Sequence, residues 1–599
     1  MKINRRILSL LSVVLGAAMS VGCDLTENMQ VKADKAMIFG SEAGLKAYSY
    51  SLYDMLPTTK SIFKQESGKC DYASCKTMNT FFVDGAYNAE TSTSWSWGNL
   101  HKINYFIDGL KSDVCTVDGA TKNHFLGIAR WFRAYFYYDK LKTYGEVPWF
   151  DHQIQNYEID YMYKDRDSRD VIIKNIIDDL DFAYEHIQGE STGNSLISKY
   201  AAAALKSRVC LFEASFRKYH GITSEAYSAD DLYGECIDAA SLVISSGKFK
   251  LNTSAGTVGA YRELFYNETP STEEAILSIC ANAESEIFGE GNWFYNSASY
   301  GNGICGVRPF VLSFLMADGT PFTAKENYEL VEFKDEFTNR DLRLAQIFRG
   351  PSYKMDGNNV VPDIITKVAM TGYHVIKFSM DSKSYDNGAK NPVGMPMIRY
   401  AEVLLNFAEA KAELGELEER DWANTIGAIR TRAGVKDLGL PAVVDTYMQE
   451  TFYPEVTDAV IMEIRRERAI ELYLEGFRMD DLRRWKAGNL FEDLPWTGMH
   501  IAALDAPIDI NGDGTNDYYF SNSAVDSKSA HKDIWIQLGT EADGLWVEAN
   551  PNGGYDLVHR TVGGRKWYDD GRQYLYPVPA KVIRDYAAEG YKISQNNNW

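Results

Sequence analysis

Apolar residues recur every three or four positions in three separate stretches of the chain, and this spacing limits the fold more than any other feature. Between residues 125 and 136 the apolar side chains fall on one helical face, and Gly145 and Pro148 then end the pattern. A second helix follows, with Ile172 and Ile176 on its apolar side. The stretch therefore predicts two antiparallel helices that share an apolar contact.

Two further stretches repeat this arrangement. One begins at Ser198, a residue type favoured as a helix N-cap, carries four alanines at 201–204, and ends its second helix at Gly247. The other runs from residue 397 to about 433, and one more helix is predicted over 460–475. Helix pairs with small residues at their contacts are typical of tetratricopeptide-like packing, although the unequal spacing of these pairs excludes a regular solenoid.

The first residues have the pattern of an export signal. Lys2, Arg5 and Arg6 precede an apolar stretch over 7–21 that is too short for a comfortable membrane span. The Ser-Val-Gly-Cys sequence that ends at Cys23 resembles a bacterial lipobox, in which Cys23 receives a diacylglycerol and becomes the mature N-terminus. Several acyl chains anchor a protein stably to a membrane. The alternative is an ordinary secretory signal in which Cys23 has no such role.

Together these patterns predict a mainly α fold, a helical hairpin scaffold with long irregular loops and a few short strands. The segments outside the helix pairs are rich in Gly, Asn, Asp and Tyr, and loops of such length are usually functional. We divide the chain into a signal peptide (1–22), N-terminal helical hairpins (23–250), an irregular insertion expected to form the ligand surface (251–395), C-terminal helical hairpins (396–490) and a loop-rich C-terminal part (491–599).

The charge and the aromatic content indicate the kind of partner. The formal charge is −21, and removal of residues 1–22, with their three basic side chains, makes it −24. A chain this acidic is poorly suited to bind the phosphate backbone of a nucleic acid. We therefore do not expect a nucleic acid as a partner. The chain has 38 Tyr, 28 Phe and 12 Trp, a surplus that suits a surface that binds ligands by stacking.

Several passages, in order, resemble the SusD/RagB family. They include LGIARWFRAYFYYDKLKTYGEVPWF (126–150), ISKYAAAALKSRVCLFEA (197–214), YLYPVPAKVI (574–583) and, most specifically, RRERAIELYLEGFRMDDLRRWKAG (465–488). The resemblance covers essentially the whole mature chain. It implies a SusD-like fold and an outer-membrane lipoprotein at the cell surface. Such a protein captures oligosaccharides, or peptides in some relatives, and passes them uncleaved to a SusC-like TonB-dependent transporter.

The helix within 465–488 could be mistaken for catalytic machinery. Glu471 and Glu475 lie one helical turn apart, which is reminiscent of the carboxylate pair of a glycosidase, but Arg468 and Arg478 are interleaved with them. Arginine neighbours keep carboxylates ionised, which suits salt bridges and opposes a protonated general acid. The sequence also lacks the HExxH and P-loop motifs, and its GxSxG match at 189–193 follows a predicted helix, not the strand that a nucleophile elbow requires. We therefore expect a structural segment and a protein that is not an enzyme.

One short loop has the residue pattern of a calcium site. Its oxygen-bearing side chains fall at alternate positions: Asp509, Asn511, Asp513, Thr515 and Asp517. Gly514 stands where such loops turn sharply, but Phe520 replaces the usual bidentate Glu. We expect either a structural Ca²⁺ or, in the alternative, an Asx-rich turn without metal.

Two aromatic clusters are the best candidates for ligand contacts. They are Trp95 with Trp97, and Trp293 with Phe294 and Tyr295. Aromatic rings cover the apolar face of a sugar, and both clusters lie outside the periodic stretches, which favours exposure. The alternative for each residue is an ordinary place in the core.

The sequence leaves three alternatives open besides the glycan-binding hypothesis. A peptide-binding relative would use the same aromatic residues. A surface glycosidase would need a carboxylate pair with a raised pKa in a cleft. A pure interaction scaffold would present an apolar groove and bind no glycan. The identity of the ligand and of the partner transporter does not follow from the residues.

Overall fold

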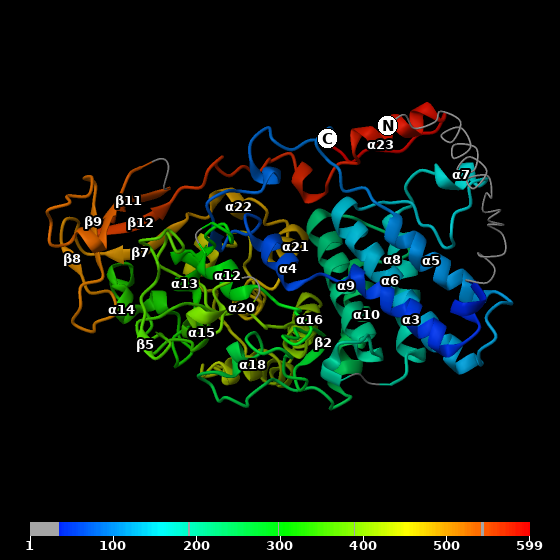
Figure 1. Ribbon diagram of the computed structural model, residues 1–599, viewed down its shortest axis with the longest axis horizontal. Coiled ribbons are helices and arrows are strands. Elements are labelled where there is room, and N and C mark those ends of the chain that lie inside the picture. Colours follow the sequence, from blue (N-terminus) through cyan, green and yellow to red (C-terminus); the bar gives the residue numbers. More distant parts are fainter. Residues whose placement is uncertain (1–34, 190–191, 298, 388–389, 541–543) are drawn as a thin grey trace, which may run out of the picture.

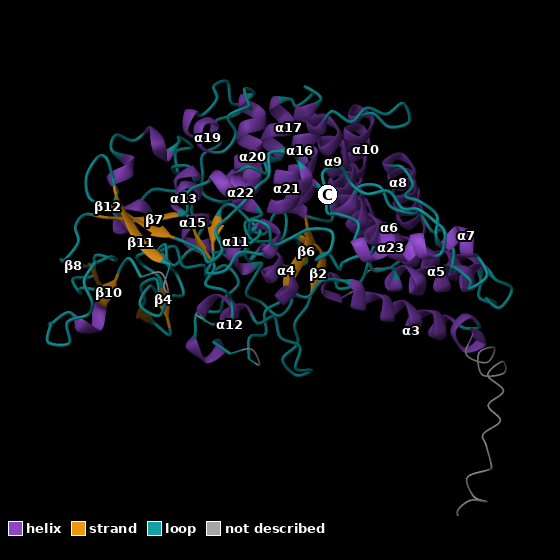
Figure 2. Ribbon diagram, turned by 90° about the horizontal axis from the view of Figure 1, so that it is seen from above, coloured by secondary structure: helices purple, strands orange, loops and turns teal. Residues whose placement is uncertain are grey.

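The computed structural model describes residues 35–189, 192–297, 299–387, 390–540 and 544–599. Figure 1 shows an elongated molecule with the N-terminal helices at one end and most of the strands at the other, and Figure 2 shows the same division from above. Cys23 and the predicted signal peptide lie outside the described residues. Within the described residues, no helix has the length and hydropathy needed to cross a bilayer.

The N-terminal part is built from packed helices, which confirms the predicted helical scaffold. Helices α6 and α8 pack together, as do α9 and α10, and α8 also packs on α9, so that the pairs form one continuous row. The elements of this part are α3 (Glu42–Leu52), α4 (Thr59–Glu66), β1 (Ala73–Ser74), α5 (Gly98–Lys111), α6 (Gly119–Tyr144), α7 (Ile159–Met162), α8 (Arg169–His186), α9 (Lys199–His220) and α10 (Ala229–Ile244).

Local sequence explains where these helices begin and how closely they approach. The Ser198 hydroxyl accepts a hydrogen bond from the Ala201 amide at 3.2 Å, so the predicted N-cap is confirmed. The four alanines at 201–204 are all buried, and the Trp131 indole donates to the Ala201 carbonyl at 3.2 Å. Gly145 ends α6 at a φ of +76°, a conformation that costs glycine little.

The row of helices continues into the C-terminal half, where α16 packs on α9, α10 and α20. The elements here are β6 (Met395–Arg399), α16 (Tyr400–Glu413), α17 (Glu419–Asn424), α18 (Ile426–Arg432), α19 (Thr446–Thr451), α20 (Ala459–Glu471), α21 (Arg478–Arg484) and α22 (Leu490–Asp493).

Three predicted boundaries in this half are wrong. The third helix pair starts after Met397, because residues up to Arg399 extend as strand β6 and pair with β2. Its second helix is interrupted at Thr425, whose φ of −118° and ψ of −89° separate α17 from α18. The helix predicted to reach Glu475 ends at Glu471, because Leu474 adopts a φ of +58° and turns the chain.

Short elements joined by long connections make up the remaining segments. Between residues 251 and 395 they are α11 (Ala260–Glu263), β2 (Ala275–Ile279), α12 (Gly291–Asn296), β3 (Cys305–Gly306), α13 (Arg308–Ser313), α14 (Phe333–Glu336), α15 (Arg343–Ile347), β4 (Lys354–Met355) and β5 (Asn358–Asn359). Strand β2 pairs with β6, β1 with β3, and β4 with β5, all antiparallel.

The C-terminal lobe contains two three-stranded sheets. The first has the antiparallel order β11-β12-β7, and the second has the order β10-β9-β8, in which β9 and β10 are parallel. The elements are β7 (Thr497–Ile501), β8 (Pro507–Ile508), β9 (Tyr518–Ser521), β10 (Trp535–Gln537), β11 (Leu545–Ala549) and β12 (Tyr555–His559). The last helix, α23 (Ala580–Ala588), lies outside this lobe, beside the N-terminal helices (Figure 1).

A buried ion-pair network centred on Glu471 joins these parts. The Glu471 carboxylate accepts hydrogen bonds from Arg343 at 2.8 Å, from Arg399 at 2.6 Å and from Arg432. These three arginines come from α15, β6 and α18, and all four side chains are at most 2% exposed. Burial alone would raise the pKa of Glu471, but the three guanidinium groups hold it well below its ordinary value.

The network continues through Glu475. Its carboxylate accepts from Arg399 at 2.8 Å and from the Lys377 ammonium at 2.7 Å. Lys377 is completely buried, which lowers its pKa to about 8 despite the carboxylate beside it. The interpretation of Glu471 and Glu475 as structural carboxylates therefore agrees with their geometry. The expected partners were wrong, however, because Arg468 pairs with Asp481 and Arg478 with Asp71.

Replacing Glu471 with Gln should destabilise the fold strongly. The side chain keeps its size, but three buried arginines lose a shared carboxylate, and a broken buried ion pair costs about 3–5 kcal/mol. Urea unfolding measures this loss, with Glu416→Gln, at an exposed position beyond α16, as the matched control. Equal free energies of unfolding for the two variants would contradict a central role for Glu471.

Candidate ligand-binding surface

The rings of Trp293 and Tyr300 form a stacked pair at the edge of the irregular segment. Their centroids lie 3.8 Å apart and their planes differ by 7°. Both side chains are half-buried, so the pair combines a supported position with access from solvent. Because each ring covers one face of the other, the outer face of Trp293 is the platform that a flat apolar ligand face could use.

Charged residues hold this pair in place. Lys60, from α4, lies 3.0 Å from Glu290, and its ammonium is 5.0 Å from the centroid of the Tyr300 ring. The Tyr300 hydroxyl donates a hydrogen bond to the same Glu290 carboxylate. These two contacts restrict the rotation of the Tyr300 ring. Less side-chain entropy would therefore be lost when a ligand binds.

Polar groups surround the base of the platform. Asn296, one helical turn from Trp293 on α12, donates to the Asp386 carboxylate at 2.9 Å, and its own carbonyl oxygen lies 2.9 Å from the His374 ring. Asn292 donates to the same oxygen of Asp386 at 3.1 Å. Partial burial raises the pKa of Asp386, although the two amide donors oppose the shift. Its half-exposed carboxyl can therefore hydrogen-bond to hydroxyl groups of a ligand.

The structure divides the predicted cluster at 293–295. Trp293 is half-buried, whereas Phe294 and Tyr295 are 3% and 2% exposed and pack on Phe63 with centroid distances of 5.4 and 5.2 Å. The expectation that these two rings are exposed is therefore wrong. A six-residue helix places consecutive side chains about 100° apart, so α12 turns Trp293 outward and its two neighbours into the core.

Trp95 and Trp97 form a separate, half-buried cluster just before α5. Their centroids are 5.4 Å apart; Trp95 also contacts Tyr144 at 4.8 Å, and Trp97 contacts Phe150 at 5.4 Å. Figures 1 and 2 show α5 and α12 well apart, so the two predicted aromatic clusters do not form one surface. A role of Trp95 and Trp97 in ligand contact stays a prediction.

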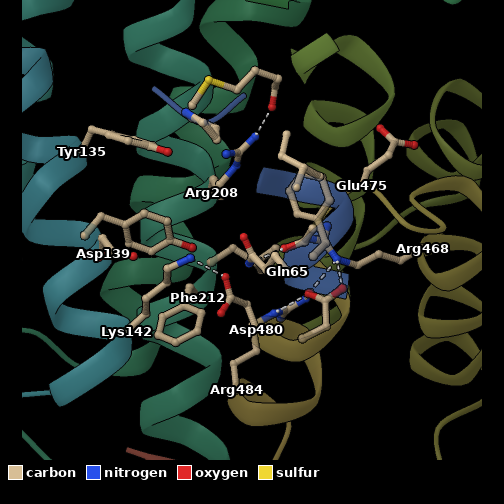
Figure 3. A pocket seen from close by; sticks show the side chains of 18 residues that line it. Gln65, Tyr135, Asp139, Lys142, Arg208, Phe212, Arg468, Glu475, Asp480 and Arg484 are labelled. Atoms are coloured by element: carbon tan, nitrogen blue, oxygen red, sulfur yellow. Dashed lines mark hydrogen bonds and ion pairs between the residues drawn. The ribbon is translucent and has the colours of Figure 1, made fainter. Parts of the chain in front are cut away.

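A narrow crevice lies where α4, α6, α9 and α21 meet (Figure 3). Tyr135 and Lys142 reach it from α6, Arg208 from α9, and Asp480 from α21, while Gln65 enters from α4. Its volume is about 90 Å³, well below the roughly 300–1,000 Å³ of typical ligand sites. The crevice is therefore too small for a saccharide in this structure.

The charges in the crevice are already compensated. Lys142 lies 2.8 Å from Asp480, and Gln65 donates to the Gly476 carbonyl at 3.3 Å. Arg208 forms two hydrogen bonds to Glu402. These contacts link the N-terminal helices to α21, so we assign the crevice to structure.

The loop with the calcium-like pattern folds as a turn held by its own side chains. The Asp509 carboxylate accepts from the Gly512 and Gly514 amides, both at 2.7 Å, and Asp513 accepts from Thr515 at 2.9 Å. Asp517 accepts from the Ile510 amide at 3.0 Å. Such contacts are typical of an Asx-rich turn.

As placed, the loop's oxygens do not converge on one point. Within the described residues, no group of three or more His, Cys, Asp or Glu side chains is arranged to hold a metal ion. Asn511 donates to Asp513 at 3.1 Å, a contact that Ca²⁺ would have to replace. Bound calcium at Asp509, Asp513 and Asp517 stays a prediction.

Sequence reasoning missed three residues of the Trp293 surface. Lys60, Tyr300 and Asp386 come from segments as much as 326 positions apart, and none belongs to a local motif. The nearest signal in the sequence is Asn296, a polar residue that directly follows the aromatic cluster.

The protein consists of a row of packed helix pairs, and its irregular segments carry a small aromatic surface. This architecture is typical of a helical scaffold that presents a ligand surface. The chain belongs to the SusD family, whose model matches residues 273–599, more than half of its length.

Several relatives share this fold. The SusD-like protein P2 of Formosa agariphila is 24% identical over 372 residues, a match that spans 60% of this chain and 64% of that relative. A SusD-like protein of Bacteroides fragilis is 19% identical with a TM-score of 0.66, covering 94% of this chain and 98% of its own. A SusD-like carbohydrate binding protein of the same species is 19% identical with a TM-score of 0.65, covering 92% and 99%. The expected family and fold class are thus confirmed.

Calcium should raise the melting temperature of the protein if the predicted site forms, because a ligand that binds only the folded state stabilises it. Asp513→Ala should remove that gain, whereas Asp526→Ala, at an exposed position in the same lobe, should keep it. Thermal unfolding with and without Ca²⁺ measures both. An equal shift in the two variants would place the ion elsewhere, and no shift in the wild type would leave the Asx-rich turn as the correct reading.

Proposed function

We propose that this protein binds glycans at the cell surface and passes them, uncleaved, to a SusC-like TonB-dependent transporter. Membership of the SusD family supports the proposal, as does a relative of the same fold described as a carbohydrate binding protein. The observation that carries it on this chain is the Trp293–Tyr300 platform with the half-exposed Asp386 beside the same helix.

The geometry suits a sugar ring. The outer face of Trp293 would cover the apolar face of a pyranose, while Asp386 would hydrogen-bond to its hydroxyl groups. Lys60 and Glu290 neutralise each other at 3.0 Å, so the platform carries no unpaired charge from this pair. A neutral saccharide is therefore the ligand that this surface favours.

Two other functions make different predictions for the same surface. A peptide side chain could stack on Trp293 equally well. A direct binding screen against glycans and peptides distinguishes these two classes of ligand. A glycosidase would need a protonated carboxyl, and the raised pKa of Asp386 is the feature that favours this alternative. Glu471 and Glu475 do not support it, because buried cations surround both carboxylates.

Trp293→Ala should weaken oligosaccharide binding at least about tenfold, a loss of about 1.4 kcal/mol, because the ligand loses its stacking face. Isothermal titration against a panel of polysaccharides and peptides measures this loss. Trp546→Ala, at a half-buried tryptophan of the C-terminal lobe, is the matched control and should bind normally.

The same titrations decide between binding and hydrolysis. Intact glycan should be recovered after incubation, and the appearance of reducing ends would overturn the proposal in favour of the glycosidase. If Asp386→Asn also stopped that release, Asp386 would be its acid. Peptide binding without glycan binding would favour the peptide-binding alternative.

We propose that Cys23 carries the lipid that anchors the protein to the outer membrane, as its lipobox-like sequence predicts. Cys23→Ala should leave the folded domain intact but move the protein from the membrane fraction to the soluble fraction. Cell fractionation followed by immunoblotting measures this distribution, with Cys115→Ala as a control that keeps the lipobox. An unchanged membrane fraction for Cys23→Ala would contradict lipidation at this residue.

A further inference from the structure

A second cavity lies in the C-terminal lobe, at the end of the molecule away from the helical row (Figure 1). Helix α14, strands β7 and β8, and the turn that follows β8 form its walls. Its volume is about 350 Å³, within the range of roughly 300–1,000 Å³ seen for small-molecule sites. The cavity shares none of its lining residues with the Trp293 platform.

The floor of this cavity is apolar and well packed. Phe333, Met499, Ile501 and Ile510 line it, and each is at most 3% exposed. The Met499 amide donates to the Thr371 carbonyl at 2.8 Å, which ties β7 to the neighbouring segment. Above this floor, the apolar surface left free for a ligand comes from half-buried or exposed lining residues: Ala502, Ala503, Ala506, Pro507 and Ile508. Such a surface favours a ligand with a methyl group or similar substituent to bury.

One polar side chain lining the cavity keeps a free hydrogen-bonding atom. The His500 Nδ1 lies 3.0 Å from Asp556, which also accepts from Arg308 at 2.7 Å. Because an ionised carboxylate only accepts, Nδ1 is the donor in this contact, and in that tautomer Nε2 is an acceptor. Nε2 makes no hydrogen bond to any described residue, although His500 is 94% buried. A ligand hydroxyl could donate to it.

The rim of the cavity is polar. Glu332 and Lys334 pair with each other at 2.7 Å, and Asp509 and Asn516 also line the cavity. The latter two belong to the Asx-rich turn, whose internal hydrogen bonds therefore shape one side of the cavity. This location explains what the loop does for the fold, with or without a metal ion.

We propose that this cavity binds a single sugar ring with an apolar substituent, such as a 6-deoxyhexose or an N-acetylhexosamine. The volume suits one ring, and the apolar lining would bury the methyl or acetyl group. His500 and the polar rim would meet the hydroxyl groups. The choice of a sugar rests on the proposed function, whereas the cavity is a separate site.

The test uses the full chain and three monosaccharides. N-acetyl-D-glucosamine and L-rhamnose should give saturation-transfer NMR signals and titrate to one site. D-glucose should bind at least about fourfold more weakly than the tighter of the two, since a buried methyl group contributes about 0.8 kcal/mol. Ala506→Trp, which fills the cavity, should abolish binding, whereas Ala524→Trp, at an exposed position outside it, should not.

Two further variants keep the test decisive. His500→Phe preserves the shape of the ring but removes the acceptor, and it should weaken binding even if Ala506→Trp proves unstable. Trp293→Ala should retain monosaccharide binding, which separates this site from the platform. Failure of all three sugars, or equal binding by wild type and Ala506→Trp, would overturn the inference while leaving polysaccharide capture at Trp293 untouched. Binding of free phenylalanine in place of the sugars would overturn the sugar assignment.

Discussion

The Glu471 carboxylate is the point on which the architecture depends. Three buried arginines from α15, β6 and α18 converge on it, and each belongs to a different part of the chain. Charges without water are costly, so the cluster is stable only when every partner is in place. It thereby selects one arrangement of these segments among the many that apolar packing alone would permit. The ion pairs join α15, β6 and α18 to α20 and so attach irregular segments to the helices.

That attachment positions the proposed binding surface around Trp293. Helix α4 buries Phe63 against Phe294 and Tyr295 and directs Lys60 toward Tyr300, so core and platform share one short helix. The two inward rings of α12 are thus the support on which Trp293 rests. A ligand surface built on packed elements needs little ordering when it binds, which suits repeated capture and release better than a mobile loop would.

The helical row is a structural scaffold, whereas the candidate ligand sites lie on the irregular segments and the C-terminal lobe. In the helical row, the charges of the crevice between α6, α9 and α21 are compensated. The Trp293 platform and the cavity beside β7 lie instead on short elements and turns, where side chains from distant segments meet. A protein of this design could change its ligand by changing those segments while its scaffold stayed the same.

The sequence alone determined the helix pairs, the N-cap at Ser198 and the structural reading of the carboxylates at 471 and 475. The helices and the cap depend on contacts between residues three or four positions apart, which a periodic pattern records directly, whereas the partners of Glu471 and Glu475 come from distant segments. Tertiary structure decided the rest: it buried Phe294 and Tyr295, paired Trp293 with Tyr300, and brought Asp386 to α12. Those outcomes depend on packing between segments whose separation along the chain has no period, so no local pattern could have shown them.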